Sequence, residues 1–222
     1  PIGVFAMIPP FNFPAMVPLW FMPWAVACGN TFIIKPSPQV PLTQNKIFEL
    51  IDKAGFPKGV INLVNGGNDV ADELLENKDI VGISSVTSVS VAKEVYKRAA
   101  KNGKRVQCQA GANNFLVVMP DANLDKAIPN MMGSCFGNAG QRCLTGSIVL
   151  GVGNIYKELK EKFVKAASSL KIGYGLEKGV DMGPVISKKT LNHLHDEIEK
   201  GISEGAKLIR DGRSIKIEGY PK

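Results

Sequence analysis

One cysteine stands at the end of a run of small residues that could activate it. Cys143 follows Arg142 in the stretch FGNAGQRCLTGS, residues 136–147. A thiol becomes a nucleophile when nearby positive charge or backbone dipoles stabilise its thiolate. Arg142 could supply that charge, and the glycines before it could let backbone N–H groups approach the thiolate. A lone cysteine is also commonly a buried, inert packing residue, so the local sequence leaves both interpretations open.

The other cysteines and the two histidines form no metal or disulfide pattern. The chain has four cysteines, far apart except for the last pair, and no CxxC spacing. This usage favours a reducing compartment. Cys135 is best explained as a packing residue on a helical face. His193 and His195 are two residues apart and would diverge on a helix, so we expect solvated helix residues and no metal site.

Three stretches follow predicted strands and could bind a ligand. PPFNFP (residues 9–14) follows the first strand, KPS (residues 35–37) follows the second, and SSVTSVSVAK (residues 84–93) connects a strand to a helix. Ligands of open α/β sheets bind beyond the carboxyl ends of the strands. Main-chain N–H groups in the third stretch could meet a phosphate. Lys35 could meet a cofactor hydroxyl or phosphate, or it could be a solvated surface lysine.

The elements that must position these residues alternate between strand-like and helix-like stretches, which predicts βαβ units and a parallel sheet. Residues 1–34 carry no charged side chain, but six prolines interrupt them, so we expect no membrane span. The expected strands are residues 2–8, 31–37, 59–66, 80–86, 114–120 and 146–153. The expected helices are residues 17–29, 41–55, 69–77, 89–103, 124–138, 155–170 and 191–205.

Composition allows a sizeable core and points to no macromolecular partner. Of the 222 residues, 45% are hydrophobic and 21% charged, which disfavours disorder. The net charge of +7 could attract an anion, but the lysines are scattered and the densest cluster, residues 97–105, lacks aromatic residues. We therefore expect an ordinary basic surface and no nucleic acid. The chain begins at Pro1 without a methionine, so we expect it to be a fragment of a longer protein. For a fragment, the lack of a signal peptide proves nothing about the compartment.

The motifs, in their order along the chain, resemble those of the aldehyde dehydrogenase superfamily over essentially all 222 residues. PPFNFP is similar to its oxyanion loop, KPSPQVP to its ribose-binding lysine turn, and QAGANN to the segment that usually carries a general base. FGNAGQRC is similar to its nucleophile box, and MGPVIS to a later structural marker. The stretches GKRVQ, AGANN, VVMPDAN, AGQRC and DGR…KIEGY narrow the resemblance to the acylating methylmalonate-semialdehyde (malonate-semialdehyde) dehydrogenases.

This resemblance implies an α/β fold of the aldehyde dehydrogenase type. We expect a Rossmann-type parallel sheet with helices on both faces, plus part of a second α/β catalytic domain. Residues 1–110 would form a partial NAD-binding domain, and residues 111–222 a partial catalytic domain whose C-terminal part is missing. The resemblance also implies a homo-oligomer, a dimer or tetramer, for the full-length parent. The compartment would be the mitochondrial matrix in a eukaryote or the cytoplasm in a bacterium.

The resemblance also implies a mechanism. The Cys143 thiolate would attack the aldehyde carbon, the Asn12 amide and the Cys143 backbone N–H would hold the oxyanion, and NAD would accept the hydride. Arg142 matches a position that holds the substrate carboxylate. Gln109 stands where hydrolytic relatives carry a glutamate, and an amide cannot remove a proton from water at neutral pH. Coenzyme A is therefore the expected acyl acceptor, and loss of CO2 would leave propionyl- or acetyl-coenzyme A.

Several positions match those that contact NAD in the family, with departures from its usual residues. Thr87 and Ser88 stand where a glycine-serine turn is usual, and Pro38 stands where a ribose-binding glutamate is common. Asn113 replaces a lysine. Two alternatives stay open: a hydrolytic aldehyde dehydrogenase, and a truncated, catalytically impaired remnant acting as a binding or structural protein. The residues expected to bind the cofactor are Phe11, Lys35, Pro36, Ser37, Thr87 and Ser88.

Overall fold

The computed structural model describes residues 1–217 and residue 219, and it divides the chain into two compact units, Pro1–Gly111 and Ala112–Lys222. Glu218 and Tyr220, which belong to the KIEGY stretch used above, lie outside the described residues, as do Pro221 and Lys222. No helix within residues 1–217 and 219 is long and apolar enough to cross a membrane.

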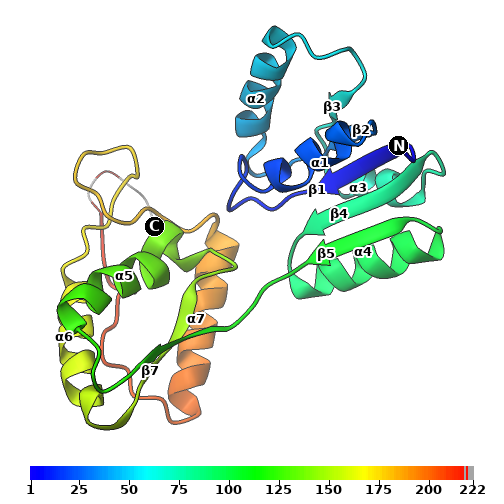
Figure 1. Cartoon of the computed structure of the whole chain (residues 1–222). Coiled ribbons are helices and arrows are strands. Elements are labelled where there is room, and N and C mark those ends of the chain that lie inside the picture. Colours follow the sequence, from blue (N-terminus) through cyan, green and yellow to red (C-terminus); the bar gives the residue numbers. More distant parts are fainter. Residues whose placement is uncertain (218, 220–222) are drawn as a thin grey trace. The chain divides into compact units, whose positions relative to one another are not determined.

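The first unit is built on a parallel sheet of five strands in the order β3-β2-β1-β4-β5 (Figure 1). The order reverses at β1, which pairs with β2 on one side and with β4 on the other. This is the doubly wound arrangement, and it confirms the predicted Rossmann-type parallel sheet. The strands are β1 (Val4–Ile8), β2 (Thr31–Ile34), β3 (Ile61–Leu63), β4 (Ile80–Val86) and β5 (Arg105–Gln109).

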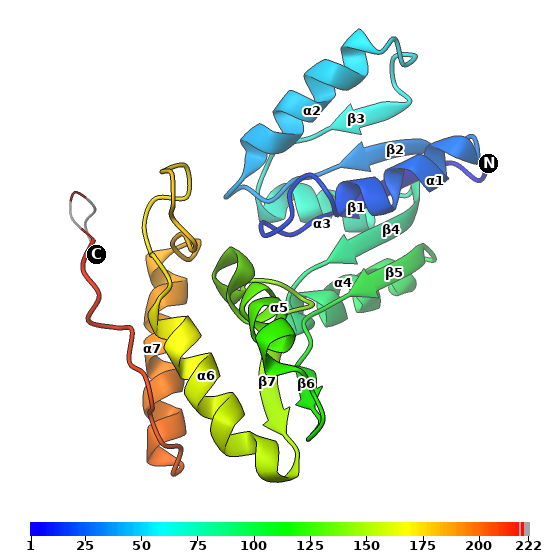
Figure 2. The ribbon, with the colours of Figure 1, turned by 60° about the vertical axis from the view of Figure 1, so that its left-hand side comes forward.

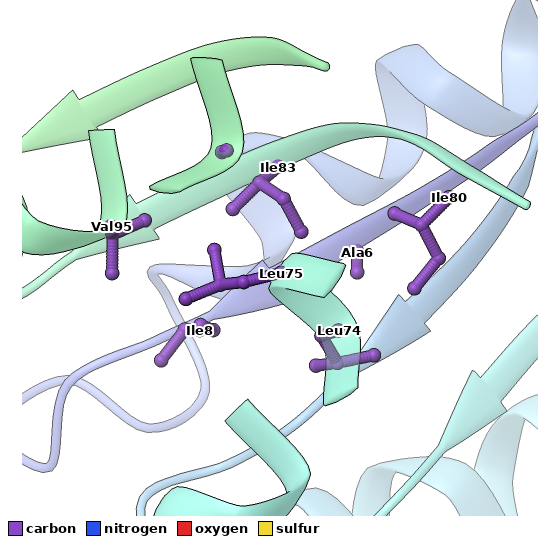
Figure 3. Close-up of a cluster of buried hydrophobic side chains, with 8 residues drawn as sticks. Ala6, Ile8, Leu74, Leu75, Ile80, Ile83 and Val95 are labelled. Carbon is purple, nitrogen blue, oxygen red and sulfur yellow. The ribbon is translucent and has the colours of Figure 1, made fainter. Parts of the chain in front are cut away.

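Helices cover both faces of this sheet, as predicted, because successive strand residues point to opposite faces. On one face, Ala6 and Ile8 of β1 pack with Leu74, Leu75 and Val95 from two helices (Figure 3). On the other face, the core contains side chains from two further helices and from the alternate strand positions. The helices are α1 (Met22–Ala27) and α2 (Pro41–Lys53) on that second face, and α3 (Asn68–Glu76) and α4 (Val89–Lys101) on the first.

In this unit one predicted helix was wrong and one strand was missed. The continuous helix expected over residues 17–29 is a 3₁₀ turn, Pro18–Trp20, followed by the short α1. Pro18 is the first residue of the 3₁₀ segment and Pro23 is the second residue of α1. The missing N–H of proline is tolerated in a first helical turn, so each proline marks a new start. Strand β5 was not predicted at all. Its side chains alternate between exposed and partly buried, so its short RVQCQ sequence lacked a continuous apolar signal.

The second unit packs helices on one face of a two-stranded parallel sheet. Strands β6 (Asn114–Val118) and β7 (Gly146–Gly151) pair in parallel. Helices α5 (Leu124–Phe136) and α6 (Tyr156–Ser168) lie against β7 (Figure 2), and their side chains form a core with Val118. A third helix, α7 (Lys188–Ser203), begins at Ser187, whose hydroxyl accepts from the Thr190 N–H at 3.2 Å. Short 3₁₀ turns span Gly137–Gly140 and Gly153–Ile155.

Candidate active site

Three of the predicted ligand-binding stretches meet at one edge of the first sheet. Residues 9–14 follow β1, residues 35–37 follow β2 and residues 87–88 follow β4. These strands are neighbours and parallel, so their carboxyl ends share an edge. The edge includes the point where the strand order reverses. The structure therefore brings together every residue of the first unit that the sequence singled out for cofactor or oxyanion binding.

Lys35 is buried at this edge. Only 4% of its surface is exposed, and its Nζ donates to the carbonyl oxygens of Pro36 at 3.0 Å and Gly66 at 3.1 Å. Burial lowers the pKa of Lys35, and the nearby charge of Asp69 opposes that shift. The alternative that Lys35 is a solvated surface lysine is therefore wrong. Two of its three ammonium donors are directed to carbonyl groups, which holds the side chain in place.

The turn after β4 places a helix N-terminus at the same edge. Ser88 is the N-cap of the 13-residue helix α4, with φ −64° and ψ 157°, and its carbonyl accepts from the Ala92 N–H at 2.8 Å. The Thr87 N–H donates to the Gln109 carbonyl at 3.1 Å. Thr87, which stands where the family usually has glycine, does not have a positive φ, so its backbone conformation does not require glycine. The N–H groups and dipole of the first helical turn suit an anionic group such as a pyrophosphate.

The loop that carries Asn12 is tied to helix α2 by a residue that the sequence did not single out. Gln44, on α2, is 1% exposed and donates from its Nε2 to the Pro14 carbonyl. Phe11 and Asn12 are partly buried, and the Asn12 amide oxygen is fully shielded from solvent. Gln44 lies 30 residues from Pro14, so no local pattern could have revealed this contact.

Gln109 ends β5 at the same edge as Thr87. Its Cα pairs with Val86, and its side chain is exposed. An exposed amide can exchange hydrogen bonds with solvent or a ligand, but it cannot act as a base at neutral pH. The position predicted to lack a general base therefore reaches solvent at the carboxyl edge of the sheet.

In the second unit, Cys143 lies on a tight turn. The Thr145 N–H donates to the Arg142 carbonyl at 3.2 Å and closes a four-residue turn with Cys143 in its second position. Thr145 Oγ1 donates to the Ser134 carbonyl of α5 at 2.9 Å. The Asn114 side chain donates to the Cys143 carbonyl at 2.8 Å. Cys143 is partly buried, and a strand and a helix both hold its turn.

Unusual backbone precedes this turn. Asn138 and Ala139 have φ values of 54° and 53°, and Gly140 follows at 72°. A residue with a Cβ loses about 1–2 kcal/mol in this left-handed region. Such a conformation persists only where the surroundings impose it, and it is frequent at functional sites. Gln141 contributes one tether, because its Oε1 accepts from the Ile186 N–H at 3.0 Å, in the MGPVIS stretch.

Ala139→Gly is expected to stabilise the second unit. Glycine adopts a φ of 53° without the Cβ penalty, so the free energy of unfolding should rise by about 0.5–1 kcal/mol. Urea unfolding followed by circular dichroism measures the change. Ala167→Gly, inside α6, is the matched control and should lower stability by about 0.5–1 kcal/mol. A loss of stability in Ala139→Gly would mean that the turn stores no backbone strain.

Arg142 packs its guanidinium over the start of the same loop. Its Nη1 donates to the Gly133 carbonyl at 3.0 Å, and a Cβ built on Gly137 would lie 2.8 Å from that nitrogen. The Arg142 Nε is buried and has no hydrogen-bond partner among the residues that the structure describes. A buried donor of this kind is costly unless a ligand or water satisfies it. Gly137 therefore leaves space for the guanidinium.

Cys135 differs from Cys143 in its surroundings. It lies near the end of α5, and burial raises the pKa of its thiol. A raised pKa leaves less thiolate at neutral pH, which suits the packing role predicted from the sequence. Cys108, on β5, accepts a hydrogen bond from the Ser85 hydroxyl at 3.3 Å. Within the described part of the chain, no group of three His, Cys, Asp or Glu side chains could hold a metal ion.

The sequence is similar to one protein family and to named bacterial proteins. The profile of the aldehyde dehydrogenase family matches residues 1–221. Malonate-semialdehyde dehydrogenase 2 of Geobacillus thermodenitrificans (strain NG80-2) is 52% identical over 213 residues, which cover 96% of this chain and 44% of that protein. The chain thus spans less than half the length of this curated relative.

The fold was compared with solved structures. One is a protein from Sinorhizobium meliloti 1021, proposed to be a methylmalonate-semialdehyde dehydrogenase and complexed with NAD. It is 44% identical, with a TM-score of 0.94 over 99% of this chain and 45% of that chain. Another is betaine aldehyde dehydrogenase from Staphylococcus aureus in complex with NAD+. It is 30% identical, with a TM-score of 0.91 over 95% of this chain and 42% of that chain.

Proposed function

The chain belongs to the aldehyde dehydrogenase family, and from this premise we propose that it carries the cofactor-binding and nucleophile segments of an NAD-dependent, acylating enzyme. Its substrate is malonate or methylmalonate semialdehyde, and its products are acetyl- or propionyl-coenzyme A and CO2. The 52% identity to a protein named malonate-semialdehyde dehydrogenase supports the substrate class. The active assembly is a homo-oligomer, a dimer or tetramer, of the whole protein.

The observation that carries this proposal is the turn at Cys143. In a trans peptide, the C=O and N–H groups point in opposite directions. The Arg142 carbonyl is engaged by Thr145 at 3.2 Å, so the N–H of the same peptide, which belongs to Cys143, points away from Thr145. That N–H is suited to hold an oxyanion formed when the Cys143 thiolate adds to an aldehyde carbon. The Asn12 amide is the proposed second oxyanion donor.

The carboxyl edge of the first sheet fits NAD. The ammonium group of Lys35 and the hydroxyl of Ser37 are proposed to bind its hydroxyl and phosphate groups. The N–H groups at the start of α4, next to Thr87 and Ser88, suit its pyrophosphate because a helix N-terminus attracts anions. Phe11 and Pro36 supply apolar surface at the same edge. When bound, NAD supplies the hydride acceptor for oxidation of the aldehyde.

Arg142 is proposed to bind the carboxylate of the semialdehyde. Its guanidinium is held at one end by the Gly133 carbonyl, which accepts from Nη1 at 3.0 Å. A guanidinium carries further N–H donors, and a carboxylate would accept charge-assisted hydrogen bonds from them. Because Arg142 precedes Cys143 in the chain, it would anchor the acid end of the substrate close to the nucleophile.

Coenzyme A is expected to accelerate turnover of the whole protein. With Gln109 in place of a carboxylate, water lacks a base, whereas a thiol supplies its own thiolate. NADH absorbance in rapid mixing with malonate semialdehyde should show a burst and then a slow phase that coenzyme A speeds up. Gln109→Glu should raise the rate without coenzyme A. Gln107→Glu, on the same strand, is the control and should leave that rate unchanged.

Two other results would contradict the proposal in different ways. Rapid steady-state oxidation to the free acid without coenzyme A would indicate a hydrolytic aldehyde dehydrogenase. No NADH formation, with or without coenzyme A, would indicate a catalytically impaired protein that binds ligands or plays a structural part.

A further inference from the structure

We infer that Asn114 is a positioning residue that sets the orientation of the Cys143 main chain for acyl transfer. The inference rests on the proposed function of Cys143. Asn114 begins β6, and its Nδ2 donates both hydrogens to the four-residue turn 142–145, called the nucleophile turn below. One bond goes to the Cys143 carbonyl at 2.8 Å and the other to the Thr145 carbonyl at 2.9 Å.

The two bonds act on the torsion angles that aim the nucleophile. Fixing the Cys143 carbonyl restrains rotation about its Cα–C bond, and fixing the Thr145 carbonyl restrains the end of the turn. The Arg142 carbonyl is held within the turn by the Thr145 N–H at 3.2 Å. Together these bonds restrain the peptide units on both sides of Cys143, and so the direction of its side chain and of its N–H.

Asn114 is itself held rigidly by the sheet. Its Cα pairs with Gly146 at the start of β7, and its N–H donates to Ser147 Oγ at 3.3 Å. Gly146 in turn donates to Ser134 Oγ at 3.1 Å, which ties the same point to α5. The amide group of Asn114 thus connects a paired strand to the nucleophile turn through two hydrogen bonds. An amide is required, because both of its partners are acceptors and a carboxylate would repel them.

Two reagents distinguish positioning for acyl transfer from a general structural role. 4-Nitrophenyl acetate reacts through an oxyanion: the Cys143 thiolate adds to the carbonyl carbon, a C–S bond forms, and 4-nitrophenolate leaves with the bonding electrons. Iodoacetamide reacts by direct displacement of iodide and forms no oxyanion. The ratio of the two rates at Cys143, measured on the chain by peptide mass spectrometry, therefore reports oxyanion stabilisation apart from exposure and thiolate content of Cys143.

Asn114→Ala is expected to lower acetylation of Cys143 by roughly 10- to 100-fold while alkylation stays within a factor of about three. Asn114→Ser keeps one donor, so its ratio should fall between those of wild type and Asn114→Ala. The control is Asn123→Ala. It removes the cap of α5, where Asn123 accepts from the Lys126 N–H at 3.1 Å, and should lower stability without changing the ratio.

Three results would overturn the inference. Equal changes of acetylation and alkylation in Asn114→Ala would show a structural role alone. The same change of ratio in Asn123→Ala would show that loss of stability is sufficient to cause it. If Cys143 of the wild-type chain is acetylated no faster than Cys135, Cys143 is not the nucleophile and the proposed function fails together with the inference. An error about Asn114 alone would leave the wild-type preference for Cys143 intact.

Discussion

Cys143→Ala is expected to abolish turnover of malonate semialdehyde in the whole protein, with a loss of at least about 10⁴-fold in kcat. Alanine cannot form the thioester on which the proposed reaction depends, and no neighbouring side chain of the turn offers a thiol. The assay is NADH formation with NAD, the semialdehyde and coenzyme A present. The loss should appear in kcat, because the residues proposed to bind NAD lie in the first unit and are unchanged.

Cys135→Ala is the matched control, since it removes a thiol only eight positions earlier in the chain. Its side chain is partly buried on α5 and burial raises its pKa, so most of the activity should remain. Labelling with iodoacetamide provides a second, independent measurement. If the label goes to Cys135 or Cys108 and spares Cys143, the assignment of the nucleophile is wrong.

Asn12→Ala is expected to lower kcat by roughly 10²–10³-fold, with a smaller effect on NAD binding. The amide is proposed to donate to charge that develops only as the thiolate adds, so its loss should raise the barrier more than it weakens the ground state. Steady-state kinetics with malonate semialdehyde, together with calorimetric titration of NAD, separates the two effects.

Asn65→Ala serves as the control for Asn12→Ala, because it removes an exposed amide that donates to Asn45 Oδ1 at 3.0 Å in the same unit. It should leave kcat close to that of wild type. A loss in Asn12→Ala that is confined to KM would remove Asn12 from the oxyanion site and leave it a role in binding alone.

Most of the fold could be predicted from the sequence, because the signal for each element is local. The apolar spacing of α2 and the short apolar runs of β1 and β4 are complete within one stretch of chain. Strand β5 was not predicted because it lacks such a local signal. Its polar residues are exposed and its strand character depends on pairing with β4, which lies some twenty residues earlier in the chain.

The candidate site divides in the same way. The sequence by itself determined which residues could do chemistry: Cys143 after Arg142, a lysine at a strand end, and a glutamine where a base is usual. The family resemblance could be recognised because it depends only on which residues occur and on their order along the chain. Only the tertiary structure decided how these residues are held.

The burial of Lys35 depends on the Gly66 carbonyl, 31 positions away, and the nucleophile turn depends on Asn114, 29 positions from Cys143. Hydrogen bonds over such separations depend on which strands pair and in which register. Strand pairing and register are fixed only when the whole unit packs, so no local sequence pattern predicts these hydrogen bonds. The sequence was therefore sufficient to identify the residue types of the site, whereas their positions are fixed only in the folded units.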